Sequence, residues 1–142
     1  MKRLILLIMM LLPLGAMAQS PHFSALMTEY STQEGCTTLN ISNAMFQSLQ
    51  IDIDAESMKV ISIENQSLIP RFREQIKELV APLNVLMSVN ANNESVEIYQ
   101  RSEEGRIKEL YIITYEGSSC VALYIYGDNL EINQVNSLIE VF

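Results

Sequence analysis

The chain offers few side chains of the kinds that enzymes use for catalysis. His22 is the only histidine in the sequence, so a Ser–His pair, a Cys–His pair or an imidazole metal site would depend on this one residue. The GxSxG, P-loop, GxGxxG and HExxH motifs do not occur in the sequence. We therefore expect a protein that is not an enzyme, with no catalytic, cofactor-binding or metal-binding residue and with an exposed His22.

Several carboxylates near residue 100 could serve as a general acid and a general base. Glu97 is followed at short range by Glu103 and Glu104, and two carboxylates can share general acid and base roles when they face one substrate. Glu103 and Glu104, however, lie in a turn composition. We therefore expect a charged hairpin tip at this point.

A second set of acidic residues occupies every second position of a short segment, a spacing that calcium ligands can have. It consists of Asp52, Asp54 and Glu56. An EF-hand loop starting at Asp52 needs a glycine and a glutamate where this chain has Ser57 and Ile63. We therefore expect an acidic, solvated connection.

Hydrophobic periodicity predicts the elements that position these residues. Helices are expected from Pro21, after Ser42 or Asn43, over 67–81 and from Asp128, where Glu131 would complete a capping box. Alternating or β-branched runs predict strands over 36–41, 58–63, 85–89, 96–100, 107–115 and 119–126. The short turns between the last four predict a C-terminal four-strand meander. The expected fold is a single α+β domain with a largely antiparallel sheet of about six strands and helices packed on it.

The N-terminal residues have the layout of a secretory signal peptide. Lys2 and Arg3 precede an apolar stretch, which ends in a small-residue cleavage pattern before Gln19. We expect residues 1–18 to be removed between Ala18 and Gln19, leaving 19–142 as the folded domain without an integral membrane segment. The expected location is periplasmic or extracellular.

The mature chain is acidic. Loss of Lys2 and Arg3 with the signal peptide changes the net charge from −8 to −10. Nucleic-acid binding depends on clustered Lys and Arg, so we expect no nucleic-acid partner.

An exported location makes a disulfide between Cys36 and Cys120 worth testing. Strand parity places each cysteine opposite the aliphatic row of its own strand, so both thiols are expected on one sheet face. A bridge also requires the two strands to be neighbours. The alternative is a pair of free thiols that pack as small apolar groups.

Tyrosines follow the last two predicted strands. Tyr111 and Tyr115 share one parity, and Tyr124 and Tyr126 share another. A row of tyrosines can form an interaction surface, because each offers apolar area with a polar tip. It can equally lie beneath a helix or belong to an ordinary exposed face.

Several stretches resemble a family of small exported Bacteroidetes proteins known as the domain of unknown function DUF4252. The stretches are Tyr30–Phe46, Val60–Asn65, Arg71–Ile76, Leu86–Val89 and Tyr126–Asp128. The resemblance implies a bacterial envelope location and, since relatives are encoded near extracytoplasmic-function sigma factors, a link to envelope signalling. It implies no activity or catalytic residue.

These observations favour an uncharacterised exported envelope protein that binds another protein through a sheet face or edge. The alternative function is a small-molecule or peptide-binding module with a pocket between helices and sheet. The expected partner is an envelope protein, and the sequence leaves the oligomeric state open.

Overall fold

A computed structural model describes residues 21–50, 55–131 and 133 of the chain. The elements occur in the order α2 (Pro21–Ser31), β1 (Cys36–Ser42), α3 (Asn43–Ser48), β2 (Ser57–Ile63), α4 (Ile69–Val80), β3 (Asn84–Ala91), β4 (Glu94–Glu103), β5 (Arg106–Glu116) and β6 (Ser119–Leu130). The signal peptide, the proposed cleavage point at Ala18 and Gln19, and Asp52 and Asp54 lie outside the described residues.

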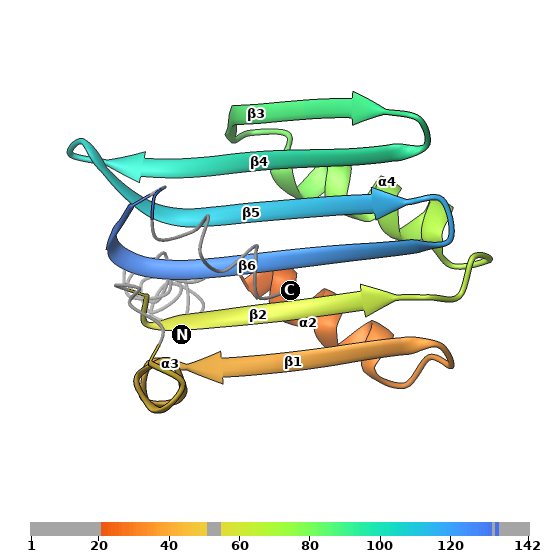
Figure 1. Cartoon of the computed structure of the whole chain (residues 1–142), viewed down its shortest axis with the longest axis horizontal. Helices are drawn as coiled ribbons and strands as arrows, with labels where there is room; N and C mark the ends of the chain where they lie inside the picture. The colour runs from red at the N-terminus through yellow and green to blue at the C-terminus, as the bar shows by residue number, and fades with distance from the viewer. Residues whose placement is uncertain (1–20, 51–54, 132, 134–142) are drawn as a thin grey trace, which may run out of the picture.

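The strands form one sheet in the order β1-β2-β6-β5-β4-β3, and every neighbouring pair is antiparallel. β3 to β6 form the predicted meander, and β2 joins it by pairing with β6 (Figure 1). The predicted α+β class and six-stranded antiparallel sheet are therefore confirmed.

Tight turns connect the strands of the meander. Asn92 and Asn93 both have positive φ, at 40° and 68°, between β3 and β4. Glu104 and Gly105 repeat this pattern, with φ of 54° and 76°, between β4 and β5. Two successive positive φ values match the twist of a two-residue hairpin, and Asn and Gly tolerate them best. The Glu103–Glu104 pair therefore lies at a hairpin tip, as predicted.

Two helices cover one face of the sheet, which we call the helix face. α2 contributes Phe23, Leu26 and Tyr30, and these side chains pack with the buried residues of α4 and of β2, β5 and β6. The helices predicted from Pro21 and over 67–81 are therefore confirmed. Figure 1 shows α2 and α4 on the same side of the sheet.

The other face of the sheet carries a second apolar cluster, centred on Ile112, Leu123 and Ile125. Phe46 of α3 packs into this cluster and is 1% exposed. Both faces of the central strands are thus apolar.

The helix predicted to begin at Asp128 does not begin there. β6 continues to Leu130, and the Asp128 carboxylate lies 2.5 Å from Lys108 Nζ and 3.5 Å from Arg106 Nη1. The hydrogen bond from Lys108 and its charge hold the pKa of this exposed carboxyl below its usual range. Asp128 thus binds cations of the adjacent strand β5 in place of a helix N-terminus. Apart from Glu131 and Asn133, the rest of that predicted helix lies outside the described residues.

No helix among the described residues combines the length and the apolar character that a membrane span requires.

Candidate functional site

The predicted tyrosine surface is wrong for its two central members. Tyr111 and Tyr124 are opposite each other across β5 and β6, and they are 3% and 0% exposed. Phe23 of α2 covers both rings, with centroids 6.0 Å from Tyr111 and 5.3 Å from Tyr124. The alternative, a tyrosine row beneath a helix, is the one that the structure supports. Tyr115 and Tyr126 are partly buried against the same core.

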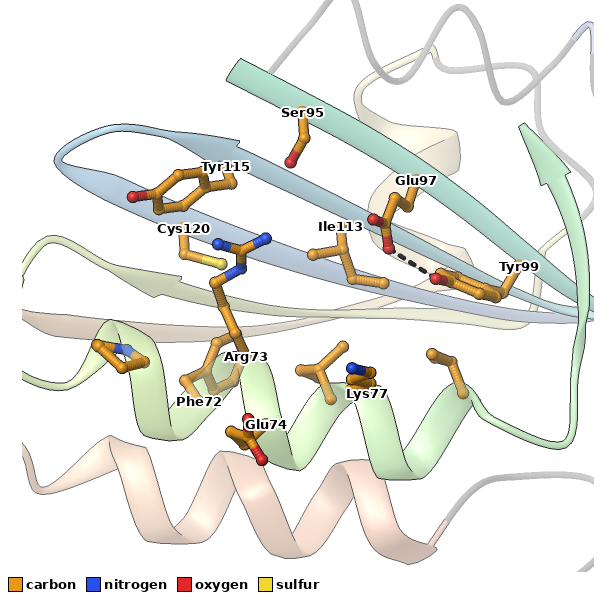
Figure 2. A pocket seen from close by; sticks show the side chains of 13 residues that line it. Phe72, Arg73, Glu74, Lys77, Ser95, Glu97, Tyr99, Ile113, Tyr115 and Cys120 are labelled. Carbon is orange, nitrogen blue, oxygen red and sulfur yellow. Dashed lines mark hydrogen bonds between the residues drawn. The ribbon is translucent and has the colours of Figure 1, made fainter. Parts of the chain in front are cut away.

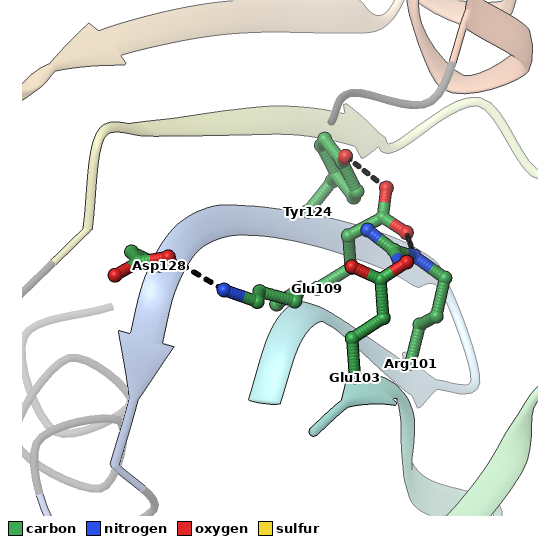
Figure 3. Close-up of polar contacts among 6 residues, drawn as sticks. Arg101, Glu103, Glu109, Tyr124 and Asp128 are labelled. Atoms are coloured by element: carbon green, nitrogen blue, oxygen red, sulfur yellow. Dashed lines mark hydrogen bonds and ion pairs between the residues drawn. The ribbon is translucent and has the colours of Figure 1, made fainter. Parts of the chain in front are cut away.

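A buried carboxylate joins the tyrosine pair to the edge of the core. Glu109 of β5 is 5% exposed. It accepts a short hydrogen bond from the Tyr124 hydroxyl and forms a close ion pair with Arg101 Nε (Figure 3). Arg101 also lies 3.0 Å from the exposed Glu103. A buried carboxylate with two donors is a satisfied structural group, so this cluster stabilises the fold.

Of the two alternatives for Cys36 and Cys120, the structure supports a pair of free thiols and not a disulfide. Both thiols do lie on the helix face, but strand β2 lies between their strands. Ile63 of β2 is opposite Cys36 on one side and opposite Cys120 on the other. Two strand spacings amount to about 9.6 Å, whereas bridged Cα atoms usually lie about 4.4–6.8 Å apart. Both cysteines are free.

The alkaline stability of the protein should depend on Cys120. Burial raises the pKa of this thiol from its ordinary value of 9.0 to about 11. Between these values the unfolded chain holds fewer protons than the folded one, so the free energy of unfolding falls as pH rises. The expected loss is on the order of 2 kcal/mol. Urea unfolding from pH 7 to 11 should therefore show a flatter pH dependence for Cys120→Ala than for wild type.

Cys36→Ala provides the matched control for this prediction. Burial also raises the pKa of the Cys36 thiol, but the residue lies on the edge strand β1 and is only partly buried. This variant should therefore retain most of the pH dependence. An unchanged slope in Cys120→Ala would show that other groups cause the alkaline loss.

The residues considered for catalysis remain apart. His22 is exposed, as predicted. Glu103 pairs with Arg101, and Glu97 lies on β4 with its carboxylate bound to Tyr99. Within residues 21–50, 55–131 and 133, no group of three His, Cys, Asp or Glu side chains is arranged to hold a metal ion.

A cleft of about 440 Å³ opens between α4 and the helix face of the sheet. Phe72, Ile76 and Val80 of α4 form its apolar base, together with Ile113 and Cys120 of the sheet. Its upper wall comes from β4 and β5 (Figure 2). The volume falls within the range of small-ligand sites.

Polar side chains converge on this cleft from both walls. Arg73 reaches up from α4, and its guanidinium carbon lies 4.4 Å from the centroid of the Tyr115 ring. On β4, the Tyr99 hydroxyl donates a 2.6 Å hydrogen bond to Glu97 Oε2 (Figure 2). Burial, followed by this hydrogen bond, raises the pKa of Tyr99 to about 12, so the phenol stays protonated at neutral pH. Lys77, Glu74 and Ser95 complete the polar lining.

The free edge of β3 is a second exposed feature. Among the residues that the structure describes, β3 pairs with β4 alone, and all eight residues of β3 are exposed. They include the large hydrophobic residues Val85, Leu86, Met87 and Val89, between 36% and 57% exposed. The strand carries no charge and no proline, the usual protections of a sheet edge.

Sequence reasoning named a sheet edge and a pocket between helices and sheet as possible binding features, but it did not identify the residues that form either one. Arg73 and Lys77 are typical of the solvated face of an amphipathic helix, and no pattern distinguishes them from Arg71, which pairs with Glu29 at 2.9 Å. The β3 segment predicts a strand in either a central or an edge position. The absence of charge in Asn84–Ala91 was the only signal of something unusual.

Comparison with known proteins provides a family and no activity. Neither the curated proteins nor the solved structures include a match. The model of the family described as Domain of unknown function (DUF4252) matches residues 30–138. This range extends from the end of α2 through the whole sheet and contains both the cleft and the β3 edge. The chain therefore belongs to the DUF4252 family.

Proposed function

We propose that this chain is a non-enzymatic, exported binding domain of the cell envelope that docks a partner protein on the free edge of β3. The observation that carries the proposal is an uncharged edge strand with every residue exposed. Strand addition uses such an edge, because its unpaired backbone groups can hydrogen-bond to an extended segment. The partner is therefore a protein with an extended, alternately apolar segment.

The predicted signal peptide supports the envelope location, and the acidic charge supports a partner other than nucleic acid. A role in envelope signalling is part of the same proposal. It rests on the genomic association that the family resemblance implies.

A lysine in β3 should abolish partner binding. In Val89→Lys, a charged side chain replaces one that is 49% exposed, so the fold is expected to tolerate the change within about 0.5 kcal/mol. The charge disrupts an apolar contact with an added strand. Affinity capture from an envelope extract should then recover a specific partner with wild type and about tenfold less, or none, with Val89→Lys.

Leu39→Lys is the matched control, since Leu39 is 46% exposed on β1, the opposite edge strand. It should capture the partner as wild type does, and the purified partner should reproduce the same ranking of affinities. Two results would refute the proposal: an equal capture by both variants, or a wild-type dimer that Val89→Lys converts to a monomer. The second result would assign the edge to another copy of the chain.

A second candidate function rests on the cleft beside α4. Its apolar base and converging polar side chains have the composition of a small-ligand site. This arrangement favours a small-molecule or peptide-binding role, which need not exclude a partner on β3.

A further inference from the structure

We propose that the cleft between α4 and the sheet binds a short apolar peptide end, with the α-carboxylate held by Arg73 and Lys77. The smallest ligand of this class is an N-acylated amino acid or dipeptide with a free carboxylate. The inference rests on the second candidate function and specifies its ligand.

The α4 wall provides the anion-binding side. Arg73 and Lys77 are four residues apart, so they lie on neighbouring turns of one helix face, and both line the cleft. Neither forms an ion pair with another described residue. The other described cations each have a hydrogen-bonding partner, namely Lys59, Arg71, Arg101, Arg106 and Lys108. Among the described Lys and Arg side chains, the two without a hydrogen-bonding partner therefore both line this cleft.

The Tyr115 ring orients one of these cations. Its face lies against the Arg73 guanidinium, with a distance of 4.4 Å from the carbon to the ring centroid. Stacking engages the flat face of the guanidinium and leaves the N–H groups at its edge available. An Arg held in this way can donate two parallel hydrogen bonds to a carboxylate.

The β4 wall provides an acceptor opposite the cations. Glu97 Oε2 receives the Tyr99 hydroxyl, while Oε1 keeps its lone pairs for a ligand donor. A carboxylate that faces an anion-binding wall disfavours a simple fatty acid, which has no donor. A peptide suits both walls, because it has an amide N–H next to its terminal carboxylate.

The base of the cleft accepts the apolar side chain of such a ligand. Ile76 and Val80 of α4 and Ile113 of β5 line it. A volume of about 440 Å³ is at the lower end of the range for small-ligand pockets. It suits one or two residues in preference to a long segment.

Calorimetric titration of the purified mature protein with three probes tests the inference. The probes are N-acetyl-leucyl-leucine, the same compound with a C-terminal amide, and decanoate. The free acid should bind at least about tenfold more tightly than the amide, because only the acid can accept charge-assisted hydrogen bonds from Arg73 and Lys77. Arg73→Gln and Lys77→Gln should each lower the affinity for the free acid by about tenfold and leave the affinity for the amide almost unchanged.

Two control variants identify the site and the ligand. Arg71→Gln removes a cation from the same helix outside the cleft and should bind as wild type does. Glu97→Gln should lower the affinity for the dipeptide but not the affinity for decanoate. Equal affinity for acid and amide would overturn the inference. Binding of decanoate alone, lost in Arg73→Gln, would refute the peptide assignment and keep the binding function, whereas no binding of any probe would refute both.

Discussion

Replacement of Arg101 by methionine is expected to lower the free energy of unfolding by about 3–5 kcal/mol, the usual cost of breaking a buried ion pair from one side. The reason is the carboxylate of Glu109, which is 5% exposed. Arg101 is its ionic partner. Methionine fills a similar volume but provides no charge, so the Glu109 carboxylate is left buried without its counter-ion. Equilibrium unfolding in urea, monitored by circular dichroism, measures the loss.

The matched control is Glu103→Gln, which removes the other acidic partner of Arg101. Glu103 lies 3.0 Å from Arg101 Nη1, but its side chain is 57% exposed. An exposed ion pair contributes about 0–1 kcal/mol, so this variant should unfold close to wild type. If Arg101→Met and Glu103→Gln were equally destabilised, the Glu109 carboxylate would not be the group that needs Arg101.

Local periodicity predicted which residues share a face but not which strands are neighbours. Cys36 and Cys120 lie on one face, as parity requires, yet β2 inserts between β1 and β6. Strand order depends on long-range packing that a two-residue repeat does not encode. The face was therefore predictable, and the distance between the thiols was not.

The burial of the tyrosines has the same physical basis. Alternation placed Tyr111 and Tyr115 on one side of β5, but it does not say whether that side is solvated or covered. The answer came from α2, whose Phe23 packs on Tyr111 and Tyr124. An apolar ring with a polar tip suits either environment.

A pocket between helices and sheet was among the expectations, but its polar residues were not predictable because they come from distant segments. Arg73 and Lys77 belong to α4, and Glu97 and Tyr99 belong to β4. Each alone is typical of a solvated surface. Only the position of α4 relative to β4 brings them to opposite walls of one cleft.

The stabilising role of the tyrosine pair leads to a second large effect. Phe23→Ala should lower the free energy of unfolding by about 3–5 kcal/mol, as truncations of buried aromatic side chains do. Phe23 is 0% exposed, and its ring joins α2 to Tyr111 and Tyr124 at once. The loss combines apolar burial, a cavity beneath the helix, and the ring contacts themselves. Urea unfolding measures it.

His22→Ala is the control, because it removes an adjacent side chain that is exposed on the same helix. It should change the free energy of unfolding by no more than about 0.5 kcal/mol. A small effect of Phe23→Ala would mean that α2 is not what buries Tyr111 and Tyr124, and the two hydroxyl-bearing rings would again be candidates for an exposed binding surface. A large effect confined to Phe23→Ala would instead leave the β3 edge and the α4 cleft as the surfaces available to a partner or ligand.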